Sequence, residues 1–286
     1  MMRSLLFVPG DSLRKFGRAR EGNADGLILD LEDSVALAQK DAACAATRQM
    51  LESGRGKQRL FVRVNAFETG RTLRDLAAVM PLRPDGIVLP KCTGGADVAQ
   101  LAHYLDAFEA MDENTAAPAQ IIGIATETAG SIHGLTTYAG ASARLWGIMW
   151  GAEDLMASLG ATENNVDGVF TGPFQMARNM CLTGAAAAGI VAIDTVSTRI
   201  HDPDHSTAEA RAARRDGFGA KAVIHPSHVD IVNTAFTPTQ AEAEWAQKVL
   251  AAFQDNPDAG VVTIDGRMID KPHVRAAEKI LAALAQ

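Results

Sequence analysis

The stretch DGLILDLED at residues 25–33 carries the pattern that decides the fold of this chain. An uninterrupted apolar run ends in a cluster of acids, without the alternation of a strand that faces water on one side. Such runs are typical of parallel strands buried on both faces. The comparable runs elsewhere are SLLFVPG at 4–10, RLFVRVN at 59–65, DGIVLPK at 85–91, QIIGIATET at 120–128, RLWGIMWGAED at 144–154, AGIVAID at 188–194 and KAVIHP at 221–226.

The segments between these runs indicate how the strands are connected. Those at 11–22, 35–53 and 206–216 are rich in Ala, Arg and Leu and are suited to amphipathic helices. A strand followed by a helix, repeated along the chain, predicts an α/β fold, a (β/α)8 TIM barrel. A doubly wound open sheet is the main alternative, but the loop VPGDS lacks the glycine spacing of a dinucleotide-binding turn.

A barrel domain is predicted at 1–235 and a C-terminal helical extension at 236–286. In the extension we expect a helix at about 239–254, an extended segment GVVTIDGRMID at 260–270 and a final helix.

Composition and charge limit the classes of function. The chain has 286 residues, 47% of them hydrophobic and 21% charged, and its net charge is -7. An acidic chain has no general basic surface for nucleic acid or membrane lipid, so an anionic substrate must meet locally placed Arg and Lys side chains. Three unpatterned cysteines, with no signal peptide and no apolar run long enough to span a membrane, predict a cytoplasmic location.

Polar side chains follow the predicted strands, at the point where each strand ends. In a barrel these ends converge on one face, where active sites are built. Buried carboxylates are costly without a partner or a metal, so repeated acids at this face indicate a functional site rather than ordinary strand ends. The residues are Asp11, Glu32, Asp33, Arg63, Asn65, Lys91, Glu127, Asp154, Asp194 and His225.

Glu127 and Asp154 are the predicted metal ligands. They follow neighbouring predicted strands, and two carboxylates that meet there repel each other unless a cation lies between them. Ligands that offer only oxygen favour Mg²⁺, with Mn²⁺ as a second candidate, and no His–Cys cluster indicates zinc. The alternatives are that Glu127 caps the helix beginning in ETAGSI, and that Asp154 pairs with an arginine.

Arg63 and the acids of DLED are further candidates. The Arg63 guanidinium is suited to bind a substrate carboxylate through two parallel hydrogen bonds, or else to form an ion pair with Glu32 or Asp33. Glu32 and Asp33 are predicted to hold metal-bound waters or Arg63, although Asp33 is equally suited to cap a helix. His225 is a minor candidate for a ligand or base, because most histidines in this setting are packing residues.

Three cations are predicted to bind the substrate beside Arg63. Arg14 and Lys15 follow the first predicted strand and are candidates for binding phosphates, although a solvated basic helix face is the ordinary interpretation of such a run. Lys91 follows the fourth predicted strand and is the third.

Eight motifs run in order from residue 4 to about 273: LLFVPGDS, LILDLEDSV, FVRVN, IVLPK, ETAGS, WGAEDLMASLGA, AVIHPSHV and DGRMIDKP. They resemble the citrate lyase beta subunit-like family, which includes malyl-CoA and citramalyl-CoA lyases. The resemblance implies a TIM barrel, Mg²⁺ on Glu127 and Asp154, and a thioester of CoA or of an acyl carrier protein that contacts Arg63. Asp33 stands where the related class II pyruvate aldolases carry a catalytic His, which argues against that branch.

The predicted function is that of a Mg²⁺-dependent carbon–carbon lyase. It would cleave a 3-hydroxy dicarboxylic acyl-CoA of the malyl-CoA or citramalyl-CoA type to a 2-oxo acid and acetyl-CoA or a homologue. Asp270 in GRMIDKP is predicted to protonate the thioester enolate, with a helix N-cap as the alternative. The resemblance implies that a neighbouring subunit supplies this acid, within a homotrimer or hexamer.

Three other functions stay open on sequence alone. A thioesterase on the same scaffold would release free CoA from malyl-CoA-like substrates. A beta subunit would act only inside a citrate lyase complex. A non-catalytic CoA-ester-binding protein would leave the set of Arg63, Glu127 and Asp154 without a chemical role.

Overall fold

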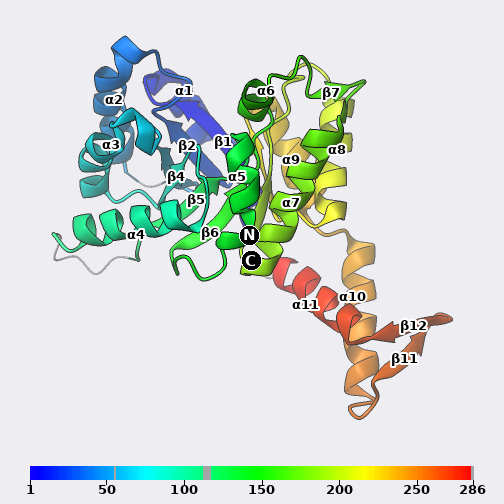
Figure 1. Cartoon of the computed structure of the whole chain (residues 1–286). Coiled ribbons are helices and arrows are strands. Elements are labelled where there is room, and N and C mark those ends of the chain that lie inside the picture. The colour runs from blue at the N-terminus through cyan, green and yellow to red at the C-terminus, as the bar shows by residue number, and fades with distance from the viewer. Residues whose placement is uncertain (55, 112–116, 285–286) are drawn as a thin grey trace. The chain divides into compact units, whose positions relative to one another are not determined.

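The computed structural model describes residues 1–54, 56–111 and 117–284, and its barrel unit covers Met2–Asn233. Parallel strands close into a barrel in the order β1-β10-β9-β6-β5-β4-β3-β2, which confirms the predicted (β/α)8 architecture (Figure 1). Each predicted apolar run overlaps one strand. The strands are β1 (Ser4–Pro9), β2 (Gly26–Asp30), β3 (Arg59–Arg63), β4 (Gly86–Leu89), β5 (Gln120–Ile124), β6 (Leu145–Met149), β9 (Val191–Asp194) and β10 (Ala220–Val223).

Strand β2 shows why the apolar runs lack alternation. Ile28 belongs to the cluster inside the barrel, with Leu5 and Phe61 from the neighbouring strands. Leu27 and Leu29 point to the opposite face of the sheet and are also fully buried. Burial of each such side chain contributes about 1.5–3 kcal/mol of transfer free energy, so both faces of the strand stabilise the barrel.

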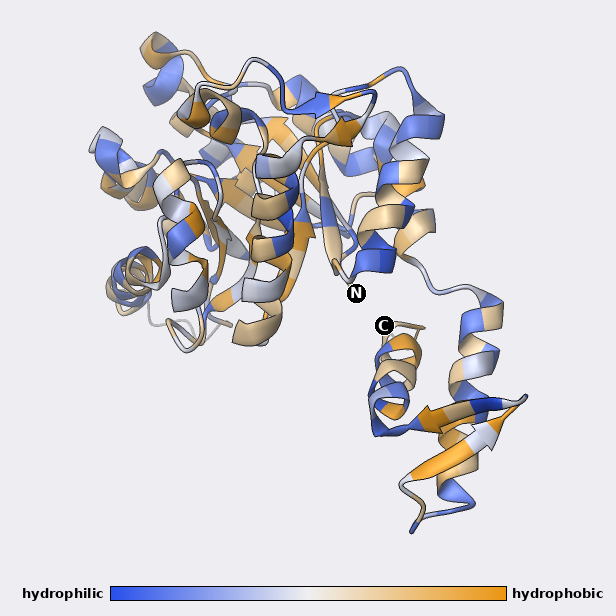
Figure 2. Ribbon diagram, turned by 45° about the vertical axis from the view of Figure 1, so that its right-hand side comes forward, coloured by the Kyte–Doolittle hydropathy of each residue, from blue (hydrophilic) through white to orange (hydrophobic). Residues whose placement is uncertain are grey.

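Helices cover the outside of the barrel, and Figure 2 shows them carrying both hydrophobic and hydrophilic residues around largely hydrophobic strands. None of the helices in the described ranges is long and apolar enough to cross a membrane. The helices of this unit are α1 (Leu13–Glu21), α2 (Lys40–Glu52), α3 (Thr72–Val79), α4 (Gly95–Glu109), α5 (Ala129–Gly134), α6 (Glu153–Leu159), α7 (Gly172–Ala188), α8 (Pro203–Asp216) and α9 (Val229–Phe236).

Local details differ from the sequence expectations. Thr128, not Glu127, caps α5, because its side chain accepts a hydrogen bond from the backbone N–H of Ser131. A short hairpin, β7 (Asn165–Val166) and β8 (Val169–Phe170), stands between α6 and α7. It was not predicted, because strands of two residues carry no periodic signal.

A second compact unit begins at Thr234 and has its own apolar core. It contains α10 (Gln240–Gln254) and α11 (Lys271–Leu284), as predicted. The segment predicted as simply extended is instead an antiparallel hairpin of β11 (Val261–Ile264) and β12 (Arg267–Asp270). It turns at Asp265 and Gly266, which both have positive φ, as an Asp-Gly type I′ turn requires.

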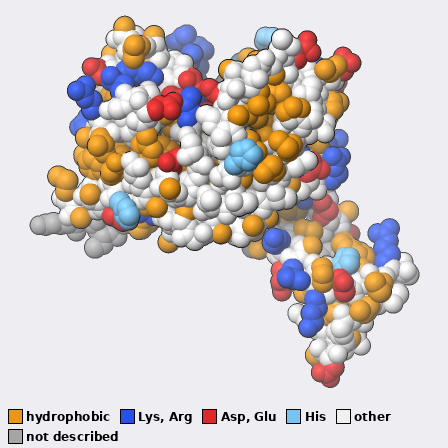
Figure 3. All heavy atoms as spheres, viewed as in Figure 1, with side chains coloured by type: hydrophobic (Ala, Val, Ile, Leu, Met, Phe, Trp, Pro, Cys, Tyr) orange, Lys and Arg blue, Asp and Glu red, His pale blue; other side chains and the backbone are white. Residues whose placement is uncertain are grey.

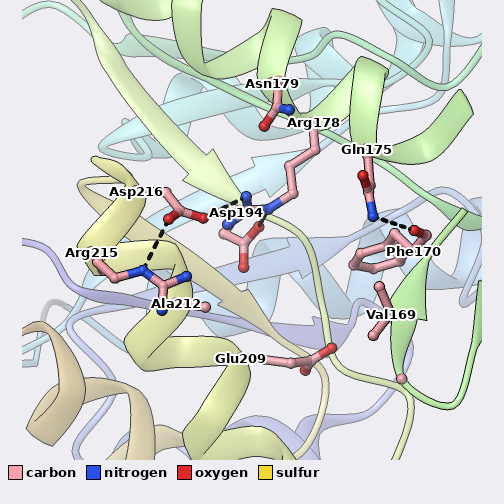
Figure 4. A pocket seen from close by; sticks show the side chains of 11 residues that line it. Val169, Phe170, Gln175, Arg178, Asn179, Asp194, Glu209, Ala212, Arg215 and Asp216 are labelled. Carbon is pink, nitrogen blue, oxygen red and sulfur yellow. Dashed lines mark hydrogen bonds and ion pairs between the residues drawn. The ribbon is translucent and has the colours of Figure 1, made fainter. Parts of the chain in front are cut away.

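Asp194 at the end of β9 belongs to a buried ionic network, although the sequence places it among the polar residues of the barrel mouth. Its carboxylate accepts hydrogen bonds from Lys221 Nζ at 2.7 Å and from Trp150 Nε1 at 2.7 Å. Figure 4 shows Arg178 reaching it from α7, with Asp216 on the other side of the guanidinium. Burial alone would raise the pKa of Asp194, but the charges of Lys221 and Arg178 hold the pKa below its usual value.

We predict that Asp194→Asn lowers the free energy of unfolding by about 3 kcal/mol at pH 7, because Lys221 then stays buried without a counter-charge. The folded-state pKa of Asp194 is depressed, so its contribution is complete above the unfolded pKa and is lost as the pH falls through the folded value. In urea unfolding, the difference in free energy of unfolding between the parent chain and Asp194→Asn should therefore become smaller below about pH 4.

Asp216→Asn is the matched control, since Asp216 contacts the same Arg178 from a more exposed position. Asp216→Asn should lower the free energy of unfolding by less than about 1 kcal/mol. An Asp194→Asn protein as stable as the control would show that the network contributes nothing.

Candidate functional site

A cavity of about 400 Å³ opens at the carboxyl ends of the barrel strands. Figure 3 shows acidic and basic side chains together in the hollow at the upper edge of this face. The cavity is the place where the predicted site residues of β2, β3, β5 and β6 meet. It is lined by Phe7, Pro9, Asp30, Asp33, Ser34, Arg63, Ile124, Glu127, Met149, Trp150, Gly151, Ala152, Glu153, Asp154, Thr195, Val196 and Ile224.

Three acids form the tightest carboxylate cluster at this face. Glu32, Asp33 and Glu127 each offer an oxygen, and these oxygens lie within 4.8 Å of one another. Burial raises the pKa of Glu127 to about 8 and also raises the pKa of Glu32. Asp154, in the first turn of α6, lines the same cavity from a more exposed position. The predicted ligands Glu127 and Asp154 therefore line one cavity, and Glu127 also lies close to the acids that follow β2.

Lys91 connects the acids of three strands. Its backbone N–H donates to Glu127 Oε2, and its ammonium donates to Glu32 Oε1 at 2.7 Å. The same ammonium lies 3.4 Å from Asp154 Oδ1. A cation at this place offsets the mutual repulsion of the carboxylates.

Asp30 is the main partner of Arg63, and the sequence did not predict this pair. Its Nε and Nη2 donate to the two oxygens of Asp30 at 2.7 and 2.8 Å. The register explains this pair, since Asp30 and Arg63 are direct partners on β2 and β3. Burial works against the charge of Arg63, but the hydrogen bonds and charge of Asp30 outweigh it and raise the pKa of the guanidinium.

The remaining face of the Arg63 guanidinium points towards the other acids. Nη1 lies 2.9 Å from Glu32 Oε2 and 3.5 Å from Asp33 Oδ2. Glu32 Oε2 is buried, yet within the described residues it accepts no hydrogen bond of good geometry. The alternative of an ion pair with Glu32 or Asp33 is thus confirmed, and Arg63 is not free to offer its whole fork to a substrate.

The acids at the mouth fit a hard cation. The ligand atoms that Glu32, Asp33 and Glu127 offer are all carboxylate oxygens. Among the described residues, Glu32 Oε2 has the Arg63 guanidinium nearby but accepts no hydrogen bond of good geometry, and burial raises the pKa of Glu127. Carboxylate oxygens are the ligands that Mg²⁺ and Mn²⁺ prefer.

Several predicted residues lie outside this cavity. Arg14 and Lys15 are exposed in the first turn of α1. Asn65 is buried and bound to Asp75, and His225 caps a 3₁₀ turn through Ser227. Asp270 lies in the second unit at the end of β12, with an oxygen 2.5 Å from His273 Nδ1.

The local structure argues against two alternative roles, that of Asp33 as a helix cap and that of Asp154 as the partner of an arginine. Asp33 does not cap a helix, because the next helical turn begins only at Leu37 and is preceded by Ala36. Asp30 instead closes the loop, since its carboxylate accepts the backbone N–H groups of Glu32 and Ser34. Asp154 is near Lys91 rather than an arginine.

A second cavity of about 430 Å³ lies between α7 and α8 over Asp194 (Figure 4). Its Arg178 and Arg215 both pair with Asp216. Because these charges already compensate one another, the cavity at the strand ends is the better candidate for catalysis.

A family model described as HpcH/HpaI aldolase/citrate lyase matches residues 3–226 of this chain. The chain belongs to the HpcH/HpaI aldolase/citrate lyase family. This result confirms the resemblance that the sequence motifs indicate, and it covers every strand of the barrel.

Individual relatives match along nearly the whole chain. A citrate lyase subunit beta-like protein of Mycobacterium tuberculosis is 34% identical, over 96% of this chain and 93% of its own length. A (3S)-malyl-CoA thioesterase of Cereibacter sphaeroides is 32% identical, over 98% and 93% respectively. The crystal structure of CitE from M. tuberculosis, in complex with magnesium, acetoacetate and coenzyme A, has a TM-score of 0.82 at 34% identity and covers 99% of this chain and 98% of its own.

We predict that Arg63→Lys lowers the free energy of unfolding by about 2 kcal/mol, because a lysine cannot donate to both oxygens of Asp30. It should also lower kcat/KM on a cleavable CoA thioester at least about tenfold. Urea unfolding and steady-state kinetics measure the two effects. Arg59→Lys, at the exposed start of the same strand, is the control and should change neither. An Arg63→Lys variant with unchanged stability and kinetics would show that the two hydrogen bonds of the guanidinium to Asp30 have no role in folding or catalysis.

Proposed function

We propose that this chain is a Mg²⁺-dependent carbon–carbon lyase that cleaves a malyl-CoA- or citramalyl-CoA-type thioester to a 2-oxo acid and acetyl-CoA or a homologue. The observation that carries the proposal is that Asp33, Glu127 and Asp154 line one cavity, with a Glu32 oxygen within 4.8 Å of those of Asp33 and Glu127. These acids make a cation site, and Arg63 adds a fixed positive charge beside it.

The residues present suit the cofactor and the substrate class. Glu127 and Asp154 would hold Mg²⁺, which, when bound, polarises the 3-hydroxyl and carboxylate of the substrate. A volume of about 400 Å³ accommodates a short dicarboxylic acyl group. A relative whose structure contains magnesium, acetoacetate and coenzyme A supports this combination of ligands.

The chain's own groups account for the steps of a retro-Claisen cleavage. Asp33 is half-exposed at the cavity wall and is placed to accept the hydroxyl proton. The carbon–carbon bond then breaks to leave a 2-oxo acid and a thioester enolate. Arg63 Nη1 faces the cavity acids and offsets developing negative charge. Protonation of the enolate carbon completes the reaction.

Asp270 is proposed to supply that last proton from a neighbouring subunit of a homotrimer or hexamer. Its carboxylate is partly exposed and contacts His273, so it is not closed off by its own unit. The sequence did not predict a role for His273, which lies in the first turn of α11, three residues after Asp270 at the end of β12.

We propose that the CoA part of the thioester binds along α1. Arg14 and Lys15 are exposed there, and the chain is acidic overall, so a local basic pair is needed for the phosphates of CoA. The acyl end would then enter the cavity.

A thioesterase is the second candidate, favoured by the name of the Cereibacter relative. Water would attack the thioester carbonyl and release free CoA in place of a carbon–carbon cleavage. A third possibility is a beta subunit that acts within a citrate lyase complex on a carrier-protein thioester. The products formed by the isolated chain distinguish these activities.

We predict that the isolated chain, supplied with Mg²⁺ or Mn²⁺, converts malyl-CoA, citramalyl-CoA or a citryl thioester to a 2-oxo acid. EDTA should abolish turnover, and Glu127→Gln should lower kcat at least about a hundredfold with an unchanged fold, because an amide is a weaker cation ligand. Glu153→Gln is the control, since Glu153 lines the same cavity but bonds Asn164.

The assay follows 2-oxo acid and free CoA in parallel. Release of free CoA without 2-oxo acid identifies a thioesterase, and full activity after exhaustive chelation excludes the metal mechanism. Activity only on a carrier-protein thioester, with the other citrate lyase subunits present, identifies the beta subunit.

We further predict that Asp270→Asn abolishes lyase turnover and leaves Mn²⁺ affinity unchanged. Co-refolding inactive Asp270→Asn with inactive Glu127→Gln should restore part of the activity, because some mixed oligomers contain an intact Glu127 site and an intact Asp270 on different chains. Asp265→Asn, in the turn of the same hairpin, should stay active. Verified mixed oligomers without activity, or an active monomer, would rule out the shared site.

A further inference from the structure

Lys91 has a backbone conformation that is uncommon for a residue with a side chain. It follows Pro90 at the end of β4 and has a φ of 51°. The left-handed region costs a non-glycine residue roughly 1–2 kcal/mol, and glycine would adopt it freely. A lysine at this position therefore indicates that its side chain is needed there.

The conformation lets one residue contact acids on two sides. The backbone N–H points at Glu127 Oε2, while the side chain returns to Glu32 Oε1 at 2.7 Å. The ammonium also lies 3.4 Å from Asp154 Oδ1. It thus lies between acids that follow β2 and β6, in the region where the proposed function places a metal.

The direction of the side chain sets Lys91 apart from a phosphate-binding lysine. Its side chain is 23% exposed, and its charged end faces carboxylates rather than solvent. Arg14 and Lys15, in contrast, are exposed. The sequence predicts Lys91 as a substrate- or CoA-binding residue, and the geometry assigns it a different partner.

We infer that Lys91 is a built-in counter-ion of the metal site: its ammonium holds Glu32 and Asp154 together before the metal binds, and competes with the metal for them. The inference rests on the proposed metal site at Glu127 and Asp154. A fixed positive charge a few ångströms from a divalent cation repels it, and the repulsion is strong where water is largely excluded. Lys91 thereby weakens metal affinity while it protects the metal-free site from carboxylate repulsion.

The test removes the charge and keeps the backbone. Lys91→Met has a side chain of similar length and the same cost of a positive φ, so only the ammonium is lost. Titration with Mn²⁺ alone, by calorimetry, should show at least about tenfold tighter binding than in the parent chain. In EDTA the variant should melt below the parent, and saturating Mn²⁺ should remove most of the difference.

Two further variants separate charge from shape. Lys91→Arg keeps a positive charge and should bind Mn²⁺ within about twofold of the parent. Lys57→Met removes an exposed lysine that contacts Asn23, away from the acids, and should change neither affinity nor melting. If Lys91→Met does not fold without metal, Lys91→Gln provides the neutral side chain for the same titration.

The outcomes distinguish this inference from the function on which it rests. A parent chain that binds no Mn²⁺ refutes the proposed metal-dependent function. A parent chain that binds Mn²⁺, with neutral Lys91 variants that bind equally or more weakly, overturns the counter-ion role alone. Tighter binding by both neutral and charged variants would assign the effect to shape and would also overturn it.

Discussion

The site depends on the repulsion among carboxylates crowded at one end of the barrel. Asp30, Glu32 and Asp33 follow a single strand, and Glu127 and Asp154 approach them from two others. Burial makes this repulsion expensive, as the raised pKa values of Glu32 and Glu127 indicate. The positions of Arg63 and Lys91 follow from this constraint, since each places its positive charge between acids of different strands.

Arg63 and Lys91 have different roles in the barrel. Arg63 pairs with Asp30 across the ladder of β2 and β3, in a register that both strands enforce through their buried apolar residues. Removal of either partner would leave a buried charge, so this pair belongs to the framework of the site. Lys91 lies on a turn, contacts the buried Glu32 as well as the more exposed Asp154, and carries its ammonium on a flexible stem.

The sequence was sufficient to predict the strands and the end of the barrel where the candidate site lies, because both follow from one-dimensional patterns. Apolar runs without alternation mark strands buried on both faces, and the residue after such a run lies at the mouth of the barrel. The sequence did not predict which of these charged side chains pair with one another. Asp30 as the partner of Arg63 depends on the register, the direction of Lys91 depends on a positive φ, and the inward network of Asp194 depends on Lys221 of the next strand. None of these leaves a periodic signal in the sequence.

The charge balance at the mouth also constrains the order of binding in the proposed reaction. A dicarboxylic acyl group is anionic, and it enters a cavity whose wall presents more carboxylates than cations among the described residues. Arg63 is already committed to Asp30, so it cannot offset that repulsion by itself. A divalent cation offsets part of the local negative charge and would bind the substrate oxygens directly. In the proposed reaction, metal binding would therefore precede productive binding of the acyl group. The CoA phosphates, which the proposal assigns to Arg14 and Lys15, would be the part of the substrate least sensitive to the metal.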